Sequence, residues 1–330
     1  MNSVLDSYAG QNPLLEIDTG FAAYLSARTR TFKDHIIGGR IDYAFDADFS
    51  LRQKFNTHSG WNKIYKNLVT NEIPNKFKRV FQTASQAGAT QYPDVYKAAK
   101  DCSERLKINM PAVFVRNSAK LEIYTLSAEN TDPAVVLTTA LCEACTKEEL
   151  RFLIGRECGH IQNNHCIYYM AAPSFGLVMD NDIINPVADE SAGKMSAAMF
   201  DWITLSDVTA DRAGIICCDN PKNYAEIMAS VHSKGLNDIY SRTGCGYDSE
   251  RVAKMFETLH VTPARSINLD SSWSKLEKRV FAGMEFLNCE VLFNWRTDID
   301  KVDVHTVTKQ ALEVRCEIIV GADSNKKGGV

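Results

Sequence analysis

The spacing of apolar residues along this chain changes near residue 74. Before that point, short apolar patches such as IDYAF are interrupted by glycines, and no helical or strand period is sustained. Beyond it, Phe77, Val80 and Phe81 recur at the i, i+3 and i+4 spacing of an amphipathic helix. We therefore expect residues 1–74 to form an N-terminal arm that precedes the folded region.

Three short β-rich runs follow a second predicted helix at residues 93–106. The runs span residues 112–115, 121–127 and 134–138, with turn residues between them. The rest of the chain returns to helical spacing. The helices expected there cover residues 146–169, 188–218, 221–235, 249–260 and 272–296. Strands segregated between helices predict an α+β fold, mostly helical, with a small antiparallel-edged sheet.

A capping box marks the start of the central predicted helix. The Thr146 hydroxyl can accept a backbone N–H, while Glu149, three residues later, can reach back to the helix start. With this helix at its centre, we expect one folded domain over residues 75–300. Residues 301–330 are expected to form a C-terminal segment that ends in a frayed tail.

The composition is that of an ordinary globular chain. Among 330 residues, 45% are hydrophobic, and 37 Lys and Arg face 41 Asp and Glu, for a net charge of −4. This balance provides no basic excess to neutralise phosphates, so no nucleic-acid partner is expected. The longest apolar stretch, residues 166–179, is short and contains Pro173, so no membrane span is expected. With no export signal, the ten cysteines indicate reduced thiols in a cytoplasmic protein.

The segment RECGH, residues 156–160, has the spacing of a metal-binding motif. Positions i and i+4 share one face of a helix, and a zinc peptidase places two imidazoles there. A glutamate beside the first imidazole then acts on a zinc-bound water. Here the first position is Arg156, whereas Glu157 and His160 hold the other two.

Two blocks of sequence resemble the family-48 metallopeptidases, the group of the HtpX and CAAX-prenyl proteases and their soluble bacterial relatives. The blocks are EELRFLIGRECGHIQNNH and the later SDVTADRAGIICC, which contains Asp207 and Asp211. The resemblance covers roughly residues 75 to 270. It implies a zincin-like fold of the gluzincin type. It further implies that His160 and the residues at 156 and 207 hold zinc.

The same resemblance gives Glu157 the role of general base and Asp211 that of orienting the first ligand. The relatives have histidine at position 156 and glutamate at position 207, where this chain has Arg156 and Asp207. A guanidinium has no lone pair to offer a metal. At 4 Å it repels a dication by about 8 kcal/mol at an effective dielectric constant near 20. That repulsion offsets most of the roughly 10–16 kcal/mol of a complete structural zinc site.

We therefore expect no cofactor, and a cluster of Arg156, Asp207 and Asp211 in place of the metal, since an arginine can pair with a carboxylate through two N–H groups. The function that follows is a non-catalytic pseudoenzyme that binds peptides or proteins. The alternative is an active zinc endopeptidase in which Arg156 turns outward, His160 and Asp207 hold zinc with one further ligand, and Glu157 is catalytic. A weaker third hypothesis, a thiol-dependent redox protein, depends on the cysteine count.

An edge strand near Leu121–Ser127 is the expected binding surface for a peptide or protein, since edge strands bind extended chains through main-chain hydrogen bonds. Tyr124 on this strand is a possible pocket residue. His260 is another, because it opens the segment HVTPAR, which resembles the family's later His-Pro…Arg segment. His165 follows His160 by five residues, about 140° around a helix, which predicts a structural or surface role away from the metal face. Cys158 is expected in the core, and the pair Cys142-x-x-Cys145 is interpreted as a coincidence.

Overall fold

The computed structural model describes residues 35–58, 60–128, 131–175, 177–180, 183–186, 193–236, 247–300 and 306–322. By its internal contacts the chain divides into two units, Met1–Asp42 and Tyr43–Val330. The first unit includes a short antiparallel pair, β1 (Ile36–Ile37) and β2 (Arg40–Ile41). The second unit contains the candidate site. The expected frayed tail at residues 326–330 lies outside the described residues.

The second unit begins before the boundary that the apolar spacing suggested. Two helices, α3 (Asp46–Asn56) and α4 (Trp61–Asn67), lie within the expected N-terminal arm and belong to this unit. The side chains that α3 buries include two charged ones, Asp48 and Arg52. Because charged residues occupy core-facing positions, the helix shows no clear apolar period in the sequence. By its internal contacts this unit therefore starts at Tyr43, whereas the apolar spacing alone suggests a start near residue 74.

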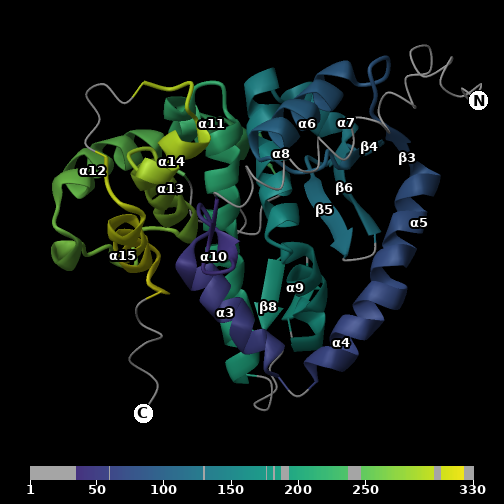
Figure 1. Cartoon of the computed structure of the whole chain (residues 1–330), viewed down its shortest axis with the longest axis horizontal. Helices are drawn as coiled ribbons and strands as arrows, with labels where there is room; N and C mark the ends of the chain where they lie inside the picture. Colours follow the sequence, from purple (N-terminus) through teal and green to yellow (C-terminus); the bar gives the residue numbers. More distant parts are fainter. Residues whose placement is uncertain are drawn as a thin grey trace, which may run out of the picture. The chain divides into compact units, whose positions relative to one another are not determined.

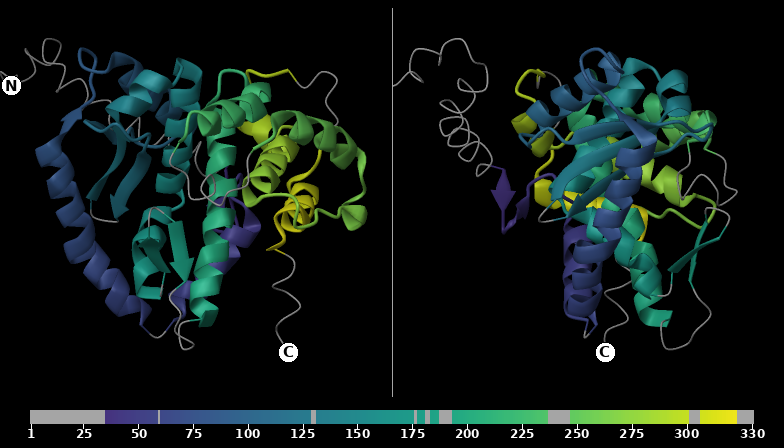
Figure 2. Two further views of the ribbon diagram at one scale, coloured as in Figure 1. Left: turned by 180° about the vertical axis from the view of Figure 1, so that it is seen from behind. Right: turned by 90° about the vertical axis from the view of Figure 1, so that its right-hand side faces the viewer.

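A single π-helical turn, η1 (Leu68–Glu72), joins α4 to α5 (Ile73–Thr83). Ile73, Phe77 and Val80 form the buried face of α5, whereas Phe81, the third residue of the predicted apolar pattern, is 63% exposed. The helix ends at Thr83, because the chain there enters a strand, β3 (Ala84–Gln86), that pairs with the sheet. Figures 1 and 2 show α5 running beside this sheet, which it contacts.

The main sheet has four strands in the order β3-β4-β6-β5. Its other members are β4 (Ala112–Arg116), β5 (Ile123–Ala128) and β6 (Thr131–Thr138). The central pair β4–β6 is parallel, and both outer pairs are antiparallel. This confirms the three predicted strands and the antiparallel edges. The strand β5 lies at one edge of the sheet and packs against α8 and α9.

The central helix α8 (Lys147–Gln162) packs closely along α10 (Gly193–Cys217) (Figure 1). Both hydrogen bonds of the predicted capping box form at its start. Its glycines permit the close packing, because a Cβ on Gly159 would lie 2.5 Å from the Cβ of Ala213. A Cβ on Gly155 would lie 2.6 Å from the Cβ of Cys217. The glycines thus bring the RECGH segment against the aspartates of α10.

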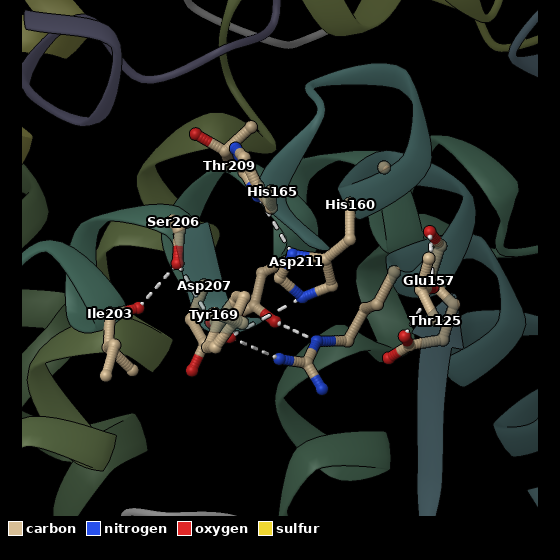
Figure 3. A network of polar contacts seen from close by, with 12 residues as sticks. Thr125, Glu157, His160, His165, Tyr169, Ile203, Ser206, Asp207, Thr209 and Asp211 are labelled. Carbon is tan, nitrogen blue, oxygen red and sulfur yellow. Dashed lines mark hydrogen bonds and ion pairs between the residues drawn. The ribbon is translucent and has the colours of Figure 1, made fainter. Parts of the chain in front are cut away.

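The predicted helix over residues 146–169 is two helices. The first ends at Gln162, Asn164 adopts a left-handed backbone conformation with φ of +56°, and α9 (His165–Ala171) begins at the next residue. Asparagine tolerates this conformation better than most residues. The break removes His165 from the face that continuous helical geometry would give it, and turns its side chain towards His160 (Figure 3).

The remaining elements surround this centre. They are α6 (Pro93–Arg105), α7 (Thr139–Ala144), η2 (Ala172–Phe175), β7 (Leu177–Asp180), β8 (Ile183–Pro186), η3 (Pro221–Asn223), α11 (Tyr224–Ser233), α12 (Ser249–Val261), η4 (Ala264–Ser266), α13 (Lys275–Phe286), α14 (Glu290–Trp295) and α15 (Lys309–Val320). The helix predicted at residues 272–296 is thus divided into α13 and α14. Among the described residues, no helix has the length and hydropathy needed to cross a membrane. The fold is α+β and mostly helical.

Candidate ion cluster on helices α8, α10 and α13

Two guanidinium groups and two carboxylates meet where α8 and α13 pack against α10. Arg156 places Nε 2.7 Å from Oδ1 of Asp211 and Nη2 3.1 Å from Oδ1 of Asp207. Arg279, from α13, places Nη1 2.9 Å from Oδ2 of Asp207 and Nε 2.7 Å from Oδ2 of Asp211. The Nε contacts are close ion pairs without aligned hydrogen-bond geometry, whereas the Nη contacts are hydrogen bonds. Each aspartate therefore contacts both arginines.

This cluster is buried and balanced in formal charge. The side chains of Arg279 and Asp211 are fully buried, and that of Arg156 is 7% exposed. The Tyr224 hydroxyl donates a further hydrogen bond, 3.2 Å long, to Oδ2 of Asp211. Burial, and then the charge of Asp211, raise the pKa of Tyr224 well above its usual value, so the hydroxyl stays a donor. Buried charges need such partners to offset lost hydration.

These side chains do not fit a zinc ion. Arg156 has no lone pair, and Asp207 and Asp211 each accept two guanidinium contacts. Zinc sites in proteins use three or four nitrogen, sulfur or oxygen ligands. Across the residues that the structure describes, no group of three or more His, Cys, Asp and Glu side chains is arranged to hold a metal.

His160 lies at the edge of the cluster with both ring nitrogens directed to polar groups (Figure 3). Its Nε2 atom is 3.7 Å from Oδ1 of Asp207, which is too long for a hydrogen bond. Its Nδ1 atom is 2.9 Å from Nδ1 of His165. Burial first, and then the nearby His165 and Arg156, lower the pKa of His160 well below its usual value. The imidazole is therefore neutral at neutral pH.

The polar network continues from His165 to Asp48 on α3. Nε2 of His165 is 3.1 Å from Oδ2 of Asp48, which also accepts the hydroxyl of Thr209 at 2.7 Å. The other carboxylate oxygen accepts Nε of Arg52 at 3.0 Å and Nε1 of Trp202 at 2.8 Å. Burial raises the pKa of Asp48, but His165, Arg52 and these hydrogen bonds more than reverse the effect and lower it. Asp48 is therefore ionised.

Glu157 is directed away from the ion cluster. Its Oε2 atom accepts a 2.8 Å hydrogen bond from the hydroxyl of Thr125 on β5. Figure 3 shows these two side chains together at the strand, apart from Asp207 and Asp211. The carboxylate thus connects the motif helix to the edge strand.

The structure does not bring Tyr124 or His260 to the cluster. Successive side chains of a strand point to opposite faces, and Thr125 faces Glu157, so Tyr124 faces away from it. Nδ1 of His260 is 4.0 Å from the carboxylate of Glu285, and its side chain is 36% exposed. None of the contacts of His260 with described residues involves the aspartates of α10.

The described cysteines are free thiols. Cys158 is buried, as the sequence indicates. Cys142 and Cys145 lie on and directly after α7, and burial raises the pKa of each thiol to about 11. A thiol with a raised pKa is a poor nucleophile at neutral pH. This arrangement offers no reactive thiolate at the C-x-x-C segment.

Comparisons with known proteins identify the family. The model of peptidase family M48 matches residues 90–271, more than half of the chain. The plastoglobule-localized metallopeptidase 48 of Arabidopsis thaliana is 24% identical over 149 residues, 45% of this chain and 43% of that protein. A protease HtpX homolog of Streptococcus mutans is 31% identical over 80 residues, which cover 24% of this chain and 27% of that protein.

A protease HtpX homolog of Ralstonia nicotianae is 19% identical over 217 residues, which cover 60% of this chain and 71% of that protein. The chain thus spans less than half the length of the Arabidopsis and Streptococcus relatives. No solved structure matches. The match to the family model covers both the RECGH segment and the aspartates of α10, and on this match the chain belongs to peptidase family M48.

Proposed function

We propose that this family member is a peptide- or protein-binding pseudoenzyme with a zincin-like fold, whose zinc site has been replaced by the ion cluster. The observation that carries the proposal is the pairing of Asp207 and Asp211 with two buried guanidinium groups, those of Arg156 and Arg279. Two carboxylates four residues apart on one helix repel each other unless cations lie beside them. Two arginines supply that charge, as a divalent ion would.

The position of Glu157 supports the loss of hydrolysis. A metallopeptidase lowers the pKa of the attacking water from 15.7 to about 7 by binding it to the metal. Without a metal, a general base faces the full cost of deprotonating water. Glu157 also accepts the hydroxyl of Thr125, so its carboxylate is engaged at the strand. We expect no peptide-bond cleavage by this route.

The edge of β5 supports the binding part of the proposal. The Glu122 carbonyl accepts the Thr138 N–H of β6, so the main-chain groups of Ile123 face the other way. The same alternation directs those of Thr125 and Ser127 to the outer side of the sheet. An extended peptide could pair with groups that point outward in this manner.

Part of this edge is covered by a thiol from α9. Sγ of Cys166 accepts the Ser127 N–H at 3.3 Å and lies 3.5 Å from the Thr125 carbonyl, to which it donates. The main-chain groups of Ile123 make no hydrogen bond on the outer side with any described residue. We therefore narrow the expected peptide-binding surface, Leu121–Ser127, to the part around Ile123. Binding along the rest of this strand requires the Cys166 thiol to move away from Thr125 and Ser127.

The alternative, an active zinc endopeptidase, draws on the relatives that are named proteases and on His160, whose Nε2 atom faces the cluster. It requires Arg156 to leave a buried position in which both aspartates bind it.

The free thiols of the described cysteines fit a cytoplasmic location, which stays a prediction.

Metal analysis and a cleavage assay on the full chain, purified without chelator, separate the two functions. We expect no stoichiometric zinc, no cleavage of casein, and measurable binding of labelled casein. About one zinc per chain, lost on His160→Ala together with cleavage, would support the peptidase instead. Absence of zinc, cleavage and binding would contradict the binding proposal while leaving the ion cluster intact.

A further inference from the structure

Three side chains form a line from α3 to the ion cluster. Asp48 lies 3.1 Å from Nε2 of His165, and Nδ1 of His165 lies 2.9 Å from Nδ1 of His160. Nε2 of His160, in turn, lies 3.7 Å from Asp207 (Figure 3). All four residues are buried. Each of the first two contacts holds a single proton. The position of the proton between the two imidazoles decides which nitrogen of His160 keeps a lone pair.

The proton positions are fixed at the Asp48 end of the line. The ionised carboxylate only accepts hydrogen bonds, so His165 carries its proton on Nε2. Burial lowers the pKa of His165, so this ring is neutral and its other nitrogen is an acceptor, which makes Nδ1 of His165 the acceptor between the two rings. The shared proton therefore belongs to Nδ1 of His160. Nε2 of His160 is left with its lone pair, directed towards Asp207.

We propose that Asp48 and His165 are positioning residues that hold His160 in the Nδ1–H tautomer. Imidazoles that bind a metal commonly donate their second N–H to an acceptor, which fixes both the ring and the tautomer. Here Asp48 and His165 keep the lone pair on Nε2 of His160 available as an acceptor beside the ion cluster. The inference goes beyond the proposed function, because it holds whether or not the protein binds or cleaves peptides.

NMR of the full chain labelled with ¹⁵N-histidine tests the assignment directly, because protonated and bare ring nitrogens differ in chemical shift. We expect Nδ1 protonated and Nε2 bare in His160, with the reverse in His165. Variants His160→Gln and His165→Gln assign the signals. A native spectrum in which His160 carries its proton on Nε2 overturns the proposal, and this result needs no variant of Asp48 to fold.

The substitution Asp48→Asn should invert both tautomers. Arg52 and Trp202 only donate, so they retain the amide oxygen on their side and turn the amide NH₂ towards His165. His165 must then accept at Nε2 and carry its proton on Nδ1, which moves the proton of His160 to Nε2. Tautomers that remain as in the native protein would overturn the proposal.

The matched control is Asp42→Asn. Asp42 is also a buried carboxylate paired with an imidazole, at 2.9 Å from Nδ1 of His35. It belongs to the first unit of the chain and takes no part in the line of three residues. The signals of His160 and His165 should stay unchanged in this variant. An inversion in the control as well would show that the tautomers respond to any loss of carboxylate charge, and would contradict a specific role for Asp48.

Discussion

Arg279 places Nη1 2.9 Å from Oδ2 of Asp207, although the two residues are 72 positions apart in the sequence. This contact adds a third helix to the pair that carries the RECGH segment and the aspartates. With Arg156 it gives two cations for two carboxylates, so neither aspartate depends on a single partner. The cluster therefore ties α8, α10 and α13 together at one buried point.

Replacing Arg156 with Met should destabilise the protein by about 3–5 kcal/mol. The change leaves two buried carboxylates with one guanidinium, and removing one partner of a buried ion pair leaves a charge without compensation. Methionine keeps much of the side-chain volume, so a cavity contributes little. The measurement is the free energy of unfolding in urea for the native and variant chains.

The matched control for this variant is Arg79→Met on α5. Arg79 is exposed and makes no ion pair with any described residue, so its loss should change stability by no more than about 0.5 kcal/mol. If the two variants lose similarly small amounts, Arg156 does not hold the buried position that the cluster requires.

Much of the fold follows from local patterns in the sequence. The capping box at Thr146, the start of α6 at Pro93 and the three β-rich runs are each specified by a few neighbouring residues. The helix α3 is different, because two of its core-facing positions, Asp48 and Arg52, are charged. Its place in the second unit depends on partners more than one hundred residues away, and these become known only in three dimensions.

Part of the site can be predicted from the sequence, and the rest depends on contacts between residues that are far apart along the chain. Arg156, Asp207 and Asp211 belong to motifs with fixed helical spacing, so their proximity could be expected. The burial of Arg279 has one signal in the sequence, its position directly before the apolar run Val280-Phe281 on a predicted helix. A continuous helix would direct His165 to another face, but the left-handed backbone at Asn164 breaks the helix before it.

The double change Arg156→His with Asp207→Glu should allow zinc to bind. It removes the guanidinium nearest the motif, adds an imidazole at the i, i+4 spacing from His160, and lengthens the third ligand by one methylene. Arg279 remains to pair with Asp211. We expect about one zinc per chain by elemental analysis, against none for the native chain.

Adding His160→Gln to the double variant is the control for this prediction, and should abolish zinc binding. Adding His165→Gln instead should weaken zinc binding by about 10–100-fold, since outer partners of ligating histidines typically contribute this much. No zinc in the double variant would mean that the pocket has repacked around the remaining arginine, Arg279.

Stability should fall as the pH drops below about 6.5. Burial lowers the pKa of both His160 and His165 in the folded state, so the unfolded chain takes up protons first. Their contribution is complete above the ordinary histidine pKa and is lost as the pH falls below it. The free energy of unfolding should therefore be lower at pH 5.5 than at pH 7.5. The charged groups of the ion cluster and the Asp48 network that lie near these rings are Asp48, Arg52, Arg156, Asp207, Asp211 and Arg279.

Urea unfolding at a series of pH values measures this dependence. Asp48 affects it only at lower pH, because its lowered pKa keeps it ionised until the pH falls well below 4. The variant His165→Gln should show a shallower slope near pH 6, whereas His58→Gln, at an exposed position, should not. Equal slopes in all three chains would show that the buried imidazoles do not resist protonation.

Removing the Cys166 thiol should strengthen binding at the edge strand. Cys166→Ala releases the Ser127 N–H and the Thr125 carbonyl, which then become available to an extended peptide. The net gain of one hydrogen bond is about 0.5–1.5 kcal/mol, so the Kd for labelled casein should fall about threefold to tenfold. Cys316→Ala is the control, because its buried thiol also contacts a backbone carbonyl, that of Ala282, on α13 rather than on the sheet. If both variants bind casein as the native chain does, the peptide does not use this part of β5.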